Sequence, residues 1–294
     1  MIKIGFHVSI AGGVSNAPKF AAAHGYTAFQ FFPSSSRAWA MKPISQVESR
    51  EFSNTVASQH LQPFAHIPYL CNPASPSTAV LAKSRNMLAE EIRVCSYLGV
   101  DSLVIHLGSH KGEGVRKGME NIVDTIVFSL DKSDKTGKAG VRLLLENSSG
   151  YSNSMGSTFS EIGDIFDEVS DKRLGICLDT CHAFSAGYDF KSAEDIERLA
   201  EEIDSFIGLK RLGLVHLNDA KYALGSGLDR HWHIGKGRIG TRGFVNFFKN
   251  RAFSSGSFIL ETPYEREGDD YRNLRATLHI MRLAGIKFRL PNLS

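Results

Sequence analysis

Histidine and carboxylate side chains follow the apolar runs of this sequence, at the positions where those runs end. In LGICLDTCHAF, residues 174–184, Asp179 follows an apolar run typical of a buried parallel strand, and His182 comes three residues later. A carboxylate in that place needs a cation or hydrogen bonds, because desolvation of its charge is unfavourable. For this segment alone, the simpler interpretation is a strand-end aspartate that caps the next turn, with His182 as a satisfied polar neighbour.

The same pattern recurs at five other apolar runs, in FAHIP, LVIHLG, LLLEN, LGLVHLND and FILET. With two further donors from the segment DRHWH, nine candidate metal ligands result: His66, His106, Glu146, Asp179, His182, His216, Asp229, His231 and Glu261. Histidine nitrogen and carboxylate oxygen are ligands that zinc takes in proteins. The recurrence favours one shared multinuclear metal site over separate capping and core residues.

The size of this ligand set points to a reaction class. Five imidazoles and four carboxylates exceed the needs of one catalytic zinc, which takes three protein ligands and keeps one position open. Neighbouring cations activate a water and stabilise the attacking and leaving oxygens of a phosphoryl displacement, so phosphodiester hydrolysis fits. A structural zinc site is usually local and cysteine-rich. The four cysteines form no CxxC pair and are interpreted as reduced thiols: Cys71, Cys95, Cys177 and Cys181.

Strand-like and helix-like segments alternate along the whole chain and must position these residues. The expected strands are residues 2–8, 28–32, 63–70, 102–108, 141–147, 174–179, 211–218 and 257–262. The expected helices include 46–60, 78–98, 118–130, 159–169, 185–206, 241–250 and 270–284. Eight such units predict parallel pairing with right-handed crossovers and a single (β/α)8 TIM barrel over residues 1–294. Because all strand C-termini of a barrel converge on one face, distant ligands can meet there.

Composition sets the outer bounds of the prediction. With 42% hydrophobic and 22% charged residues and no apolar run near 18 residues, the sequence predicts a globular enzyme without a membrane span. Its start, MIKIGFHVS, lacks the regions of a secretory signal, which predicts a cytoplasmic protein. The formal charge is +3, and setting aside the four acidic candidate ligands leaves 34 basic against 27 acidic residues. A basic surface suits a polyanionic partner.

Other residues near the same face receive plainer interpretations. His7, His110 and His233 are interpreted as partners of ligands or satisfied polar residues rather than as further ligands. The segment GKGRIG, residues 235–240, lacks the phosphate-loop and dinucleotide fingerprints, so it is interpreted as a flexible loop and no nucleotide cofactor is expected. Arg37 lies in a loop without helical periodicity, which favours ligand contact.

Several segments together resemble a known family: FHVSIAGG, HIPYL, IHLGSH, LENSSG, CLDTCHAFSAGYD, VHLNDAK, LDRHWHIGKGRIG and LETP. The chain resembles, essentially end to end, the endonuclease IV family of zinc-dependent apurinic/apyrimidinic endonucleases. That resemblance implies a (β/α)8 barrel that binds three Zn2+ ions. It further implies an enzyme that hydrolyses the phosphodiester 5′ to an abasic site in duplex DNA, leaving a 3′-hydroxyl and a 5′-deoxyribose phosphate, and that also removes 3′-blocking groups. We expect a monomer.

The resemblance also implies roles for individual residues. One ion takes His66, His106 and Glu146, a second takes Glu146, Asp179, His216 and Glu261, and a third takes His182, Asp229 and His231. Glu146 and Glu261 set the position and basicity of the attacking hydroxide. Arg37, Tyr69 and Leu70 enter the DNA at the lesion. Here PSSS precedes Arg37 where the family carries longer amide and basic side chains, which predicts a smaller contribution of this loop to DNA affinity.

Two other functions share parts of this pattern. A metal-dependent sugar isomerase or epimerase uses a similar barrel with histidine and carboxylate ligands, and fold alone does not exclude it. Such enzymes need fewer ions, so the third ligand set argues against this function. A non-catalytic binder of damaged DNA is the second alternative, and the intact ligand set argues against it.

Overall fold

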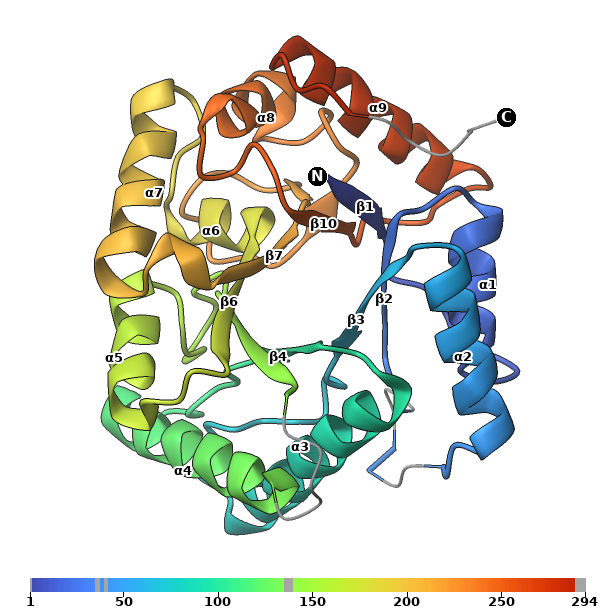
Figure 1. Cartoon of the computed structure of the whole chain (residues 1–294). Helices are drawn as coiled ribbons and strands as arrows, with labels where there is room; N and C mark the ends of the chain where they lie inside the picture. The colour runs from blue at the N-terminus through green and yellow to red at the C-terminus, as the bar shows by residue number, and fades with distance from the viewer. Residues whose placement is uncertain (1, 35–37, 40–41, 135–139, 289–294) are drawn as a thin grey trace.

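Eight parallel strands form the centre of the protein in a computed structural model that describes residues 2–34, 38–39, 42–134 and 140–288 (Figure 1). They are β1 Lys3–Phe6, β2 Ala28–Phe31, β3 Gln62–His66, β4 Ser102–His106, β5 Arg142–Glu146, β6 Leu174–Asp179, β7 Leu212–His216 and β10 Ser257–Leu260. The sheet runs in the order β1-β10-β7-β6-β5-β4-β3-β2. A parallel bridge between His7 and Gln30 joins its two ends, which closes the barrel. The predicted (β/α)8 fold is therefore confirmed.

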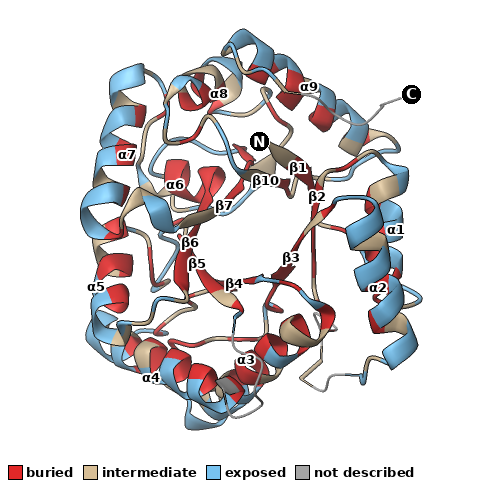
Figure 2. Ribbon diagram, in the orientation of Figure 1, coloured by how far each residue is buried: buried red, intermediate tan, exposed pale blue. Residues whose placement is uncertain are grey.

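Most helices form an outer ring whose buried faces point toward the strands, and one short, buried helix, residues 180–186, lies inside that ring (Figure 2). The helices are α1 Asn16–Ala23, α2 Gln46–Ser58, α3 Thr78–Leu98, α4 Val115–Asp134, α5 Phe159–Val169, α6 Thr180–Ala186, α7 Ala193–Phe206, the 3-10 helix η1 Leu209–Arg211, α8 Gly240–Lys249 and α9 Asp269–Leu283. The segment expected as one helix after residue 185 is divided, because Gly187 ends α6 with a φ of 118° that favours glycine. Within the described residues, no helix is long and apolar enough to cross a membrane.

The inside of the barrel is filled by one small apolar layer. Seven strands each contribute one buried residue to it: Ala28, Phe64, Val104, Leu144, Cys177, Leu214 and Ile259. On β1 the backbone at Gly5 replaces a side chain, since a Cβ there would lie 1.7 Å from the Ala28 carbonyl oxygen. Successive strand side chains alternate between the two faces, so the residue two positions further on also points into the barrel. This layer is the floor of the site described below.

The connection from residue 219 to residue 240 is ordered by one buried carboxylate. It contains a short antiparallel pair, β8 Asp219–Ala220 and β9 His231–Trp232. Asp219 accepts hydrogen bonds from the backbone N–H groups of residues 235, 237, 239 and 240 at 2.9–3.3 Å. A Cβ at Gly237 would lie 2.3 Å from Asp219 Oδ1, so glycine is required there. The expectation that residues 235–240 form a flexible loop is wrong, because Asp219 fixes their backbone.

A fully buried carboxyl group lies beneath the loop that follows β2. Glu91 of α3 is 0% exposed and accepts a hydrogen bond from the Ser34 hydroxyl. Its second oxygen, Oε2, has no hydrogen-bond partner within the described residues. Burial raises the pKa of Glu91 to about 8, against the lowering effect of the Ser34 hydrogen bond. The folded protein therefore keeps this group neutral at pH 7.

Glu91→Gln is expected to remove one component of the pH dependence of stability. The unfolded chain releases this proton above about pH 4.5 and the folded chain holds it to about pH 8. In that window the free energy of unfolding of the wild type falls with rising pH by up to about 1.4 kcal/mol per unit. The variant cannot ionise, so its stability relative to wild type should rise from pH 5 to pH 8 in urea unfolding. A difference that is equal at both pH values contradicts this assignment.

Candidate metal centre

A ring of polar side chains lies directly above the apolar floor of the barrel. Each strand residue of that floor is followed, two positions later, by a member of the ring, and the ring comprises Gln30, His66, His106, Glu146, Asp179, His216 and Glu261, with His7 above Gly5. Strand alternation points all of them into the barrel at the C-terminal ends of the strands. Six of these eight are among the nine candidate ligands. The fold thus brings together residues as distant in sequence as His66 and Glu261.

Within the described residues, four groups of donor atoms have all their members within 4.8 Å of one another, and one of them joins Cys181 to Asp179 and His231. The other three consist of candidate ligands alone: His66 with His106 and Glu146; Glu146 with Asp179, His216 and Glu261; and His182 with Asp229 and His231. These are the same three sets that the family resemblance implies. Glu146 belongs to two of them. Its Oε2 lies 3.1 Å from His66 Nε2 and its Oε1 lies 3.0 Å from His216 Nδ1. One carboxylate therefore lies between two groups of donors, as a bridging ligand does.

The third group is assembled from α6 and the connection between β7 and α8. Asp179 ends β6 and caps α6, since its Oδ1 accepts from the backbone N–H of His182 at 2.8 Å. This cap fixes His182 beside the ring. Asp229 Oδ1 lies 3.3 Å from His182 Nε2 and 3.5 Å from His231 Nε2. Asp179 can therefore cap α6 through Oδ1 and also belong to a metal-binding group, so the two interpretations of this residue are compatible.

The histidine tautomers test whether the residues fit metal ions. His66 Nδ1 lies 2.7 Å from the Ile67 carbonyl oxygen, His182 Nδ1 2.9 Å from that of Asn147, and His231 Nδ1 3.0 Å from that of Glu261. Each carbonyl can accept the Nδ1 proton, which in the neutral imidazole leaves the lone pair on Nε2. Nε2 of His182 and of His231 is buried without a hydrogen-bond partner in the described part of the chain. Bare, buried, converging imidazole nitrogens fit a divalent cation.

Two carboxylates of the ring, Glu146 and Glu261, are ionised despite their burial. Burial opposes ionisation of Glu146, yet the neighbouring His106 and His216 hold its pKa well below the ordinary range. In Glu261, burial likewise raises the pKa, and His216 and His7 more than compensate and hold it well below that range. Conversely, burial lowers the pKa of His216, but Cys177, Glu261 and Glu146 raise it well above its ordinary value. The site therefore concentrates negative charge that calls for positive charge at its centre.

Several amide side chains that hold the ring were missed by sequence reasoning. Asn218 donates to Asp179 Oδ2 at 2.7 Å and accepts from the Glu261 backbone N–H at 2.8 Å. Asn147 accepts from the Asp179 backbone N–H at 2.7 Å. Asn147 follows the strand-end Glu146 by one residue in LLLEN, and Asn218 follows His216 by two in LVHLN, which is a signal that could have identified them. Gln30, inside the apolar strand AFQF, is the third such residue.

The other histidines near this face differ in their environments. His7 Nδ1 accepts from Gln30 Nε2 at 3.0 Å and lies 3.6 Å from Glu261 Oε1, so this member of the ring is a neighbour of a candidate ligand. His110 accepts from the backbone N–H groups of Gly112 and Gly114 and orders the β4–α4 loop. His233 lies 3.2 Å from Glu265.

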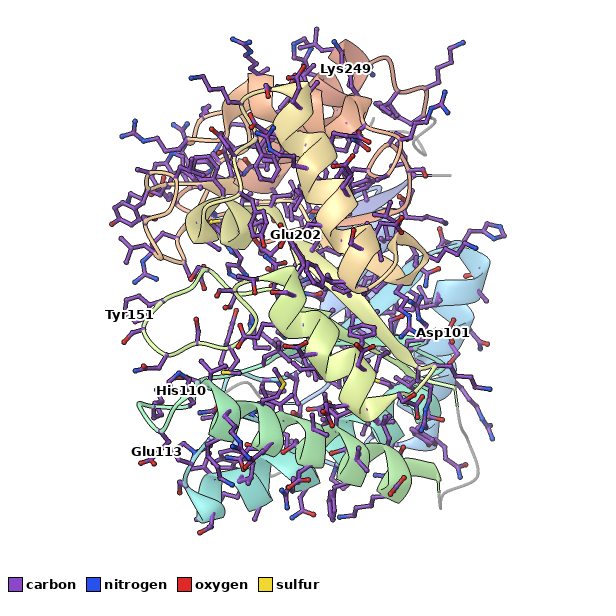
Figure 3. All side chains as sticks on the ribbon, turned by 90° about the vertical axis from the view of Figure 1, so that its left-hand side faces the viewer. Asp101, His110, Glu113, Tyr151, Glu202 and Lys249 are labelled. Atoms are coloured by element: carbon purple, nitrogen blue, oxygen red, sulfur yellow. The ribbon has the colours of Figure 1, made fainter. Side chains whose placement is uncertain are left out.

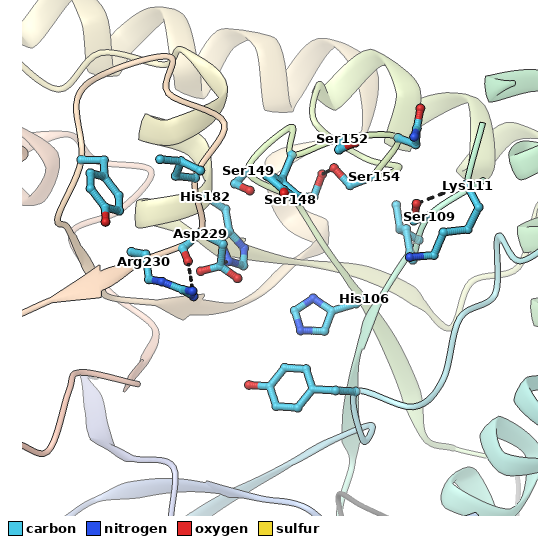
Figure 4. Close-up of a pocket in the computed structure, with 17 residues that line it drawn as sticks. His106, Ser109, Lys111, Ser148, Ser149, Ser152, Ser154, His182, Asp229 and Arg230 are labelled. Carbon is cyan, nitrogen blue, oxygen red and sulfur yellow. Dashed lines mark hydrogen bonds and ion pairs between the residues drawn. The ribbon is translucent and has the colours of Figure 1, made fainter.

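A cavity of about 740 Å³ opens beside the third donor group (Figure 4). His106, His182 and Asp229 line it, together with Lys111 and Arg230 and with side chains from the β4–α4 and β5–α5 loops. In Figure 3, the exposed Tyr151 and the buried His110 of these loops lie at the end of the barrel opposite Asp101, which precedes β4. The metal centre is therefore accessible from the loop face, next to basic side chains.

Of the predicted DNA-contacting residues, Tyr69 lines this cavity. Tyr69 is 69% exposed, and its ring stacks on His106 with the centroids 5.7 Å apart. Leu70, which follows it, is partly exposed. Arg37 lies outside the described residues.

Comparisons with known proteins agree with this geometry. A family model described as a xylose isomerase-like TIM barrel matches residues 18–283. A Methanoculleus marisnigri protein named probable endonuclease 4 is 43% identical over 276 residues, covering 93% of this chain and 97% of that protein. Endonuclease IV from Thermus thermophilus has a TM-score of 0.84 at 34% identity, covering 95% of this chain and 99% of that one.

A more distant match concerns the fold only. A D-tagatose 3-epimerase-like protein has a TM-score of 0.72 at 19% identity, covering 96% of this chain and 98% of that one. This likeness shows that one barrel architecture occurs in proteins with different activities in their names. The identity to the endonucleases is higher and extends over nearly the whole chain. The chain therefore belongs to the endonuclease IV family of enzymes with the xylose isomerase-like TIM-barrel fold.

Proposed function

We propose that this protein is a zinc-dependent DNA repair endonuclease that hydrolyses the phosphodiester 5′ to abasic sites in duplex DNA. The products are a 3′-hydroxyl and a 5′-deoxyribose phosphate, and 3′-blocking groups are a second substrate class. The observation that carries the proposal is the arrangement of nine donors in three groups, two of which share Glu146. The chain acts as one domain over residues 1–294 and as a monomer.

The three donor groups assign the residues that would hold three Zn2+ ions. His66, His106 and Glu146 would hold one ion; Glu146, Asp179, His216 and Glu261 a second; His182, Asp229 and His231 a third. When bound, the ions supply a nucleophile at neutral pH and neutralise charge on the transferring phosphoryl group. Glu146 and Glu261 orient the attacking water. The carbonyl-bound Nδ1 protons of His66, His182 and His231 keep the ligating nitrogens bare.

The surface around the centre supports a nucleic acid substrate. Apart from the four carboxylate ligands, basic residues outnumber acidic ones by 34 to 27. Lys111 and Arg230 line the cavity beside His182, in reach of a phosphate backbone. Sugar isomerisation receives less support, because the epimerase likeness stays at 19% identity and the third donor group exceeds the smaller ion requirement of such enzymes.

An incision assay with two forms of the lesion tests this function. The enzyme should cut duplex DNA at a tetrahydrofuran abasic analogue as well as at a natural abasic site, because attack of water on phosphorus does not need the sugar aldehyde. A polymerase should extend the 3′ product directly, since it ends in a hydroxyl. Cleavage of the natural aldehyde alone, with an unsaturated aldehyde at the 3′ end, would show a lyase instead. Epimerisation of a ketose without DNA incision would establish the alternative function, that of a sugar epimerase.

Tyr69 and Leu70 are predicted to give selectivity for damaged DNA. Unstacking costs least at a lesion, so side chains that fill the space of a flipped abasic nucleotide convert this difference into preference. Tyr69→Ala with Leu70→Ala should weaken binding to abasic duplex by about 1–3 kcal/mol and binding to undamaged duplex much less. Fluorescence anisotropy with both duplexes measures this.

The matched control for this pair is Phe128→Ala, which removes an aromatic ring that is 40% exposed on α4. It should leave both affinities unchanged. Equal losses on both duplexes, together with a lower melting temperature, would mean that Tyr69 and Leu70 only pack against the protein. Zinc content should stay at the wild-type value in every variant.

A further inference from the structure

One member of the polar ring has no assigned role, although it is completely buried. Gln30 is 0% exposed and occupies the ring position of β2, two residues after the floor residue Ala28. Its neighbours in the strand AFQF are apolar. A buried amide is unfavourable unless its donors and acceptor are satisfied, so the contacts of Gln30 show why the strand carries it.

All the hydrogen bonds of the Gln30 amide go to the metal centre or to its neighbour His7. The amide Nε2 donates to Glu261 Oε1 at 2.8 Å and to His7 Nδ1 at 3.0 Å. The amide Oε1 lies 2.8 Å from His216 Nε2. Gln30 therefore joins Glu261 to His216, which belong to the same donor group.

The orientation of this amide follows from the chemistry of its partners. An ionised Glu261 accepts hydrogen bonds only, so the NH2 group of Gln30 must face it. The oxygen of the amide then faces His216 Nε2, which must carry the proton. In the neutral form of His216, which is the form that binds a cation, Nδ1 then carries the lone pair, and this atom lies 3.0 Å from Glu146 Oε1 and 3.3 Å from Glu261 Oε2. Three lone pairs that converge in this way fit a cation placed among them.

We propose that Gln30 is a positioning residue of the ion site formed by Glu146, Asp179, His216 and Glu261. It fixes the tautomer in which His216 presents Nδ1 to the ion, and it holds one oxygen of Glu261 so that the other faces the ion. The inference rests on the proposed metal-dependent function. In this proposal β2 supplies no ligand itself. Its residue Gln30 supports two ligands from other strands, His216 at the end of β7 and Glu261 directly after β10.

Two substitutions separate positioning from simple core packing. Gln30→Met fills nearly the same space and removes the acceptor and the donor, so one of the bound ions should be held about 10–100-fold more weakly. Under a graded chelator challenge this variant should lose one zinc ion per chain before the wild type does. Its kcat should fall and recover in excess zinc, while KM for abasic duplex stays unchanged. A packing role predicts no effect of zinc on kcat.

Gln30→Glu keeps an acceptor for the His216 Nε2 proton but, when ionised, cannot donate to Glu261. It should therefore retain zinc better than Gln30→Met, yet show a reduced kcat. The matched control is Asn121→Leu on α4, outside the ring, which removes another buried amide hydrogen bond, to the Ser75 carbonyl oxygen. It should lower stability without changing zinc retention.

The outcomes distinguish this inference from the proposed function. If wild-type protein binds zinc and incises abasic DNA, but both Gln30 variants match it in zinc retention and kcat, the role of Gln30 is refuted and the function stands. If Gln30→Met does not fold, a wild-type kcat for Gln30→Glu refutes the role. If wild-type protein neither binds zinc nor incises, the proposed function itself fails.

Discussion

Glu261→Gln should lower kcat for incision at abasic sites by about a thousandfold or more, which corresponds to about 4 kcal/mol of transition-state stabilisation. Glu261 lies at the end of β10 in the donor group of Glu146 and His216, and neighbouring histidines hold its pKa well below the ordinary range. A neutral amide in its place cannot supply that negative charge. Single-turnover incision at saturating enzyme measures the change.

DNA affinity provides the control for this variant. Glu261→Gln alters the centre and leaves the basic rim intact, so binding to abasic duplex should remain measurable. Glu267→Gln removes an exposed carboxylate six residues further along the chain and should leave kcat unchanged. A wild-type kcat in Glu261→Gln would remove this residue from the mechanism.

Removal of the metal ions should abolish incision and lower thermal stability. Glu146 and Asp179 are at most 1% exposed, and without cations their charges depend on protonated histidines for compensation. A ligand that binds the folded state alone at 100 times its Kd adds about 2.7 kcal/mol, so the metal-free protein should melt several degrees lower. Prolonged dialysis against a chelator, followed by calorimetry and incision assays, measures both effects.

Added zinc should restore activity and melting temperature together in that experiment. If added zinc restored the incision activity but not the melting temperature, the effect of the ions on catalysis would be separate from their effect on stability. Full activity in protein shown to be metal-free would contradict the proposed chemistry.

The barrel and most of the metal centre could be predicted because two simple patterns coincide in this chain. Buried parallel strands appear as apolar runs, and their C-terminal ends share one face. A histidine or carboxylate at the end of such a run is therefore visible in the sequence, as His106 and Glu146 are. His182 was visible as well, since it follows Asp179 by three residues, the spacing of a helix cap.

Other features depend on contacts that no local pattern records. Gln30 resembles any polar residue in a strand until the barrel closes and places it beside Glu261 and His216. The glycines of residues 235–240 alone predict a flexible loop. The backbone of this loop is held by hydrogen bonds to Asp219, which lies 16 or more residues earlier in the chain. Glu91 occupies an ordinary helical position, and only the packing of Ser34 against it shows that it is buried.

The number of zinc ions per chain in active protein tests the central claim most directly. Nine donors in three groups, with Glu146 shared by two of them, predict close to three ions. Protein purified without chelators and reconstituted with zinc should therefore contain close to three ions by elemental analysis, with specific incision activity rising as the sites fill. Fully active protein that contains one ion or fewer would contradict the account.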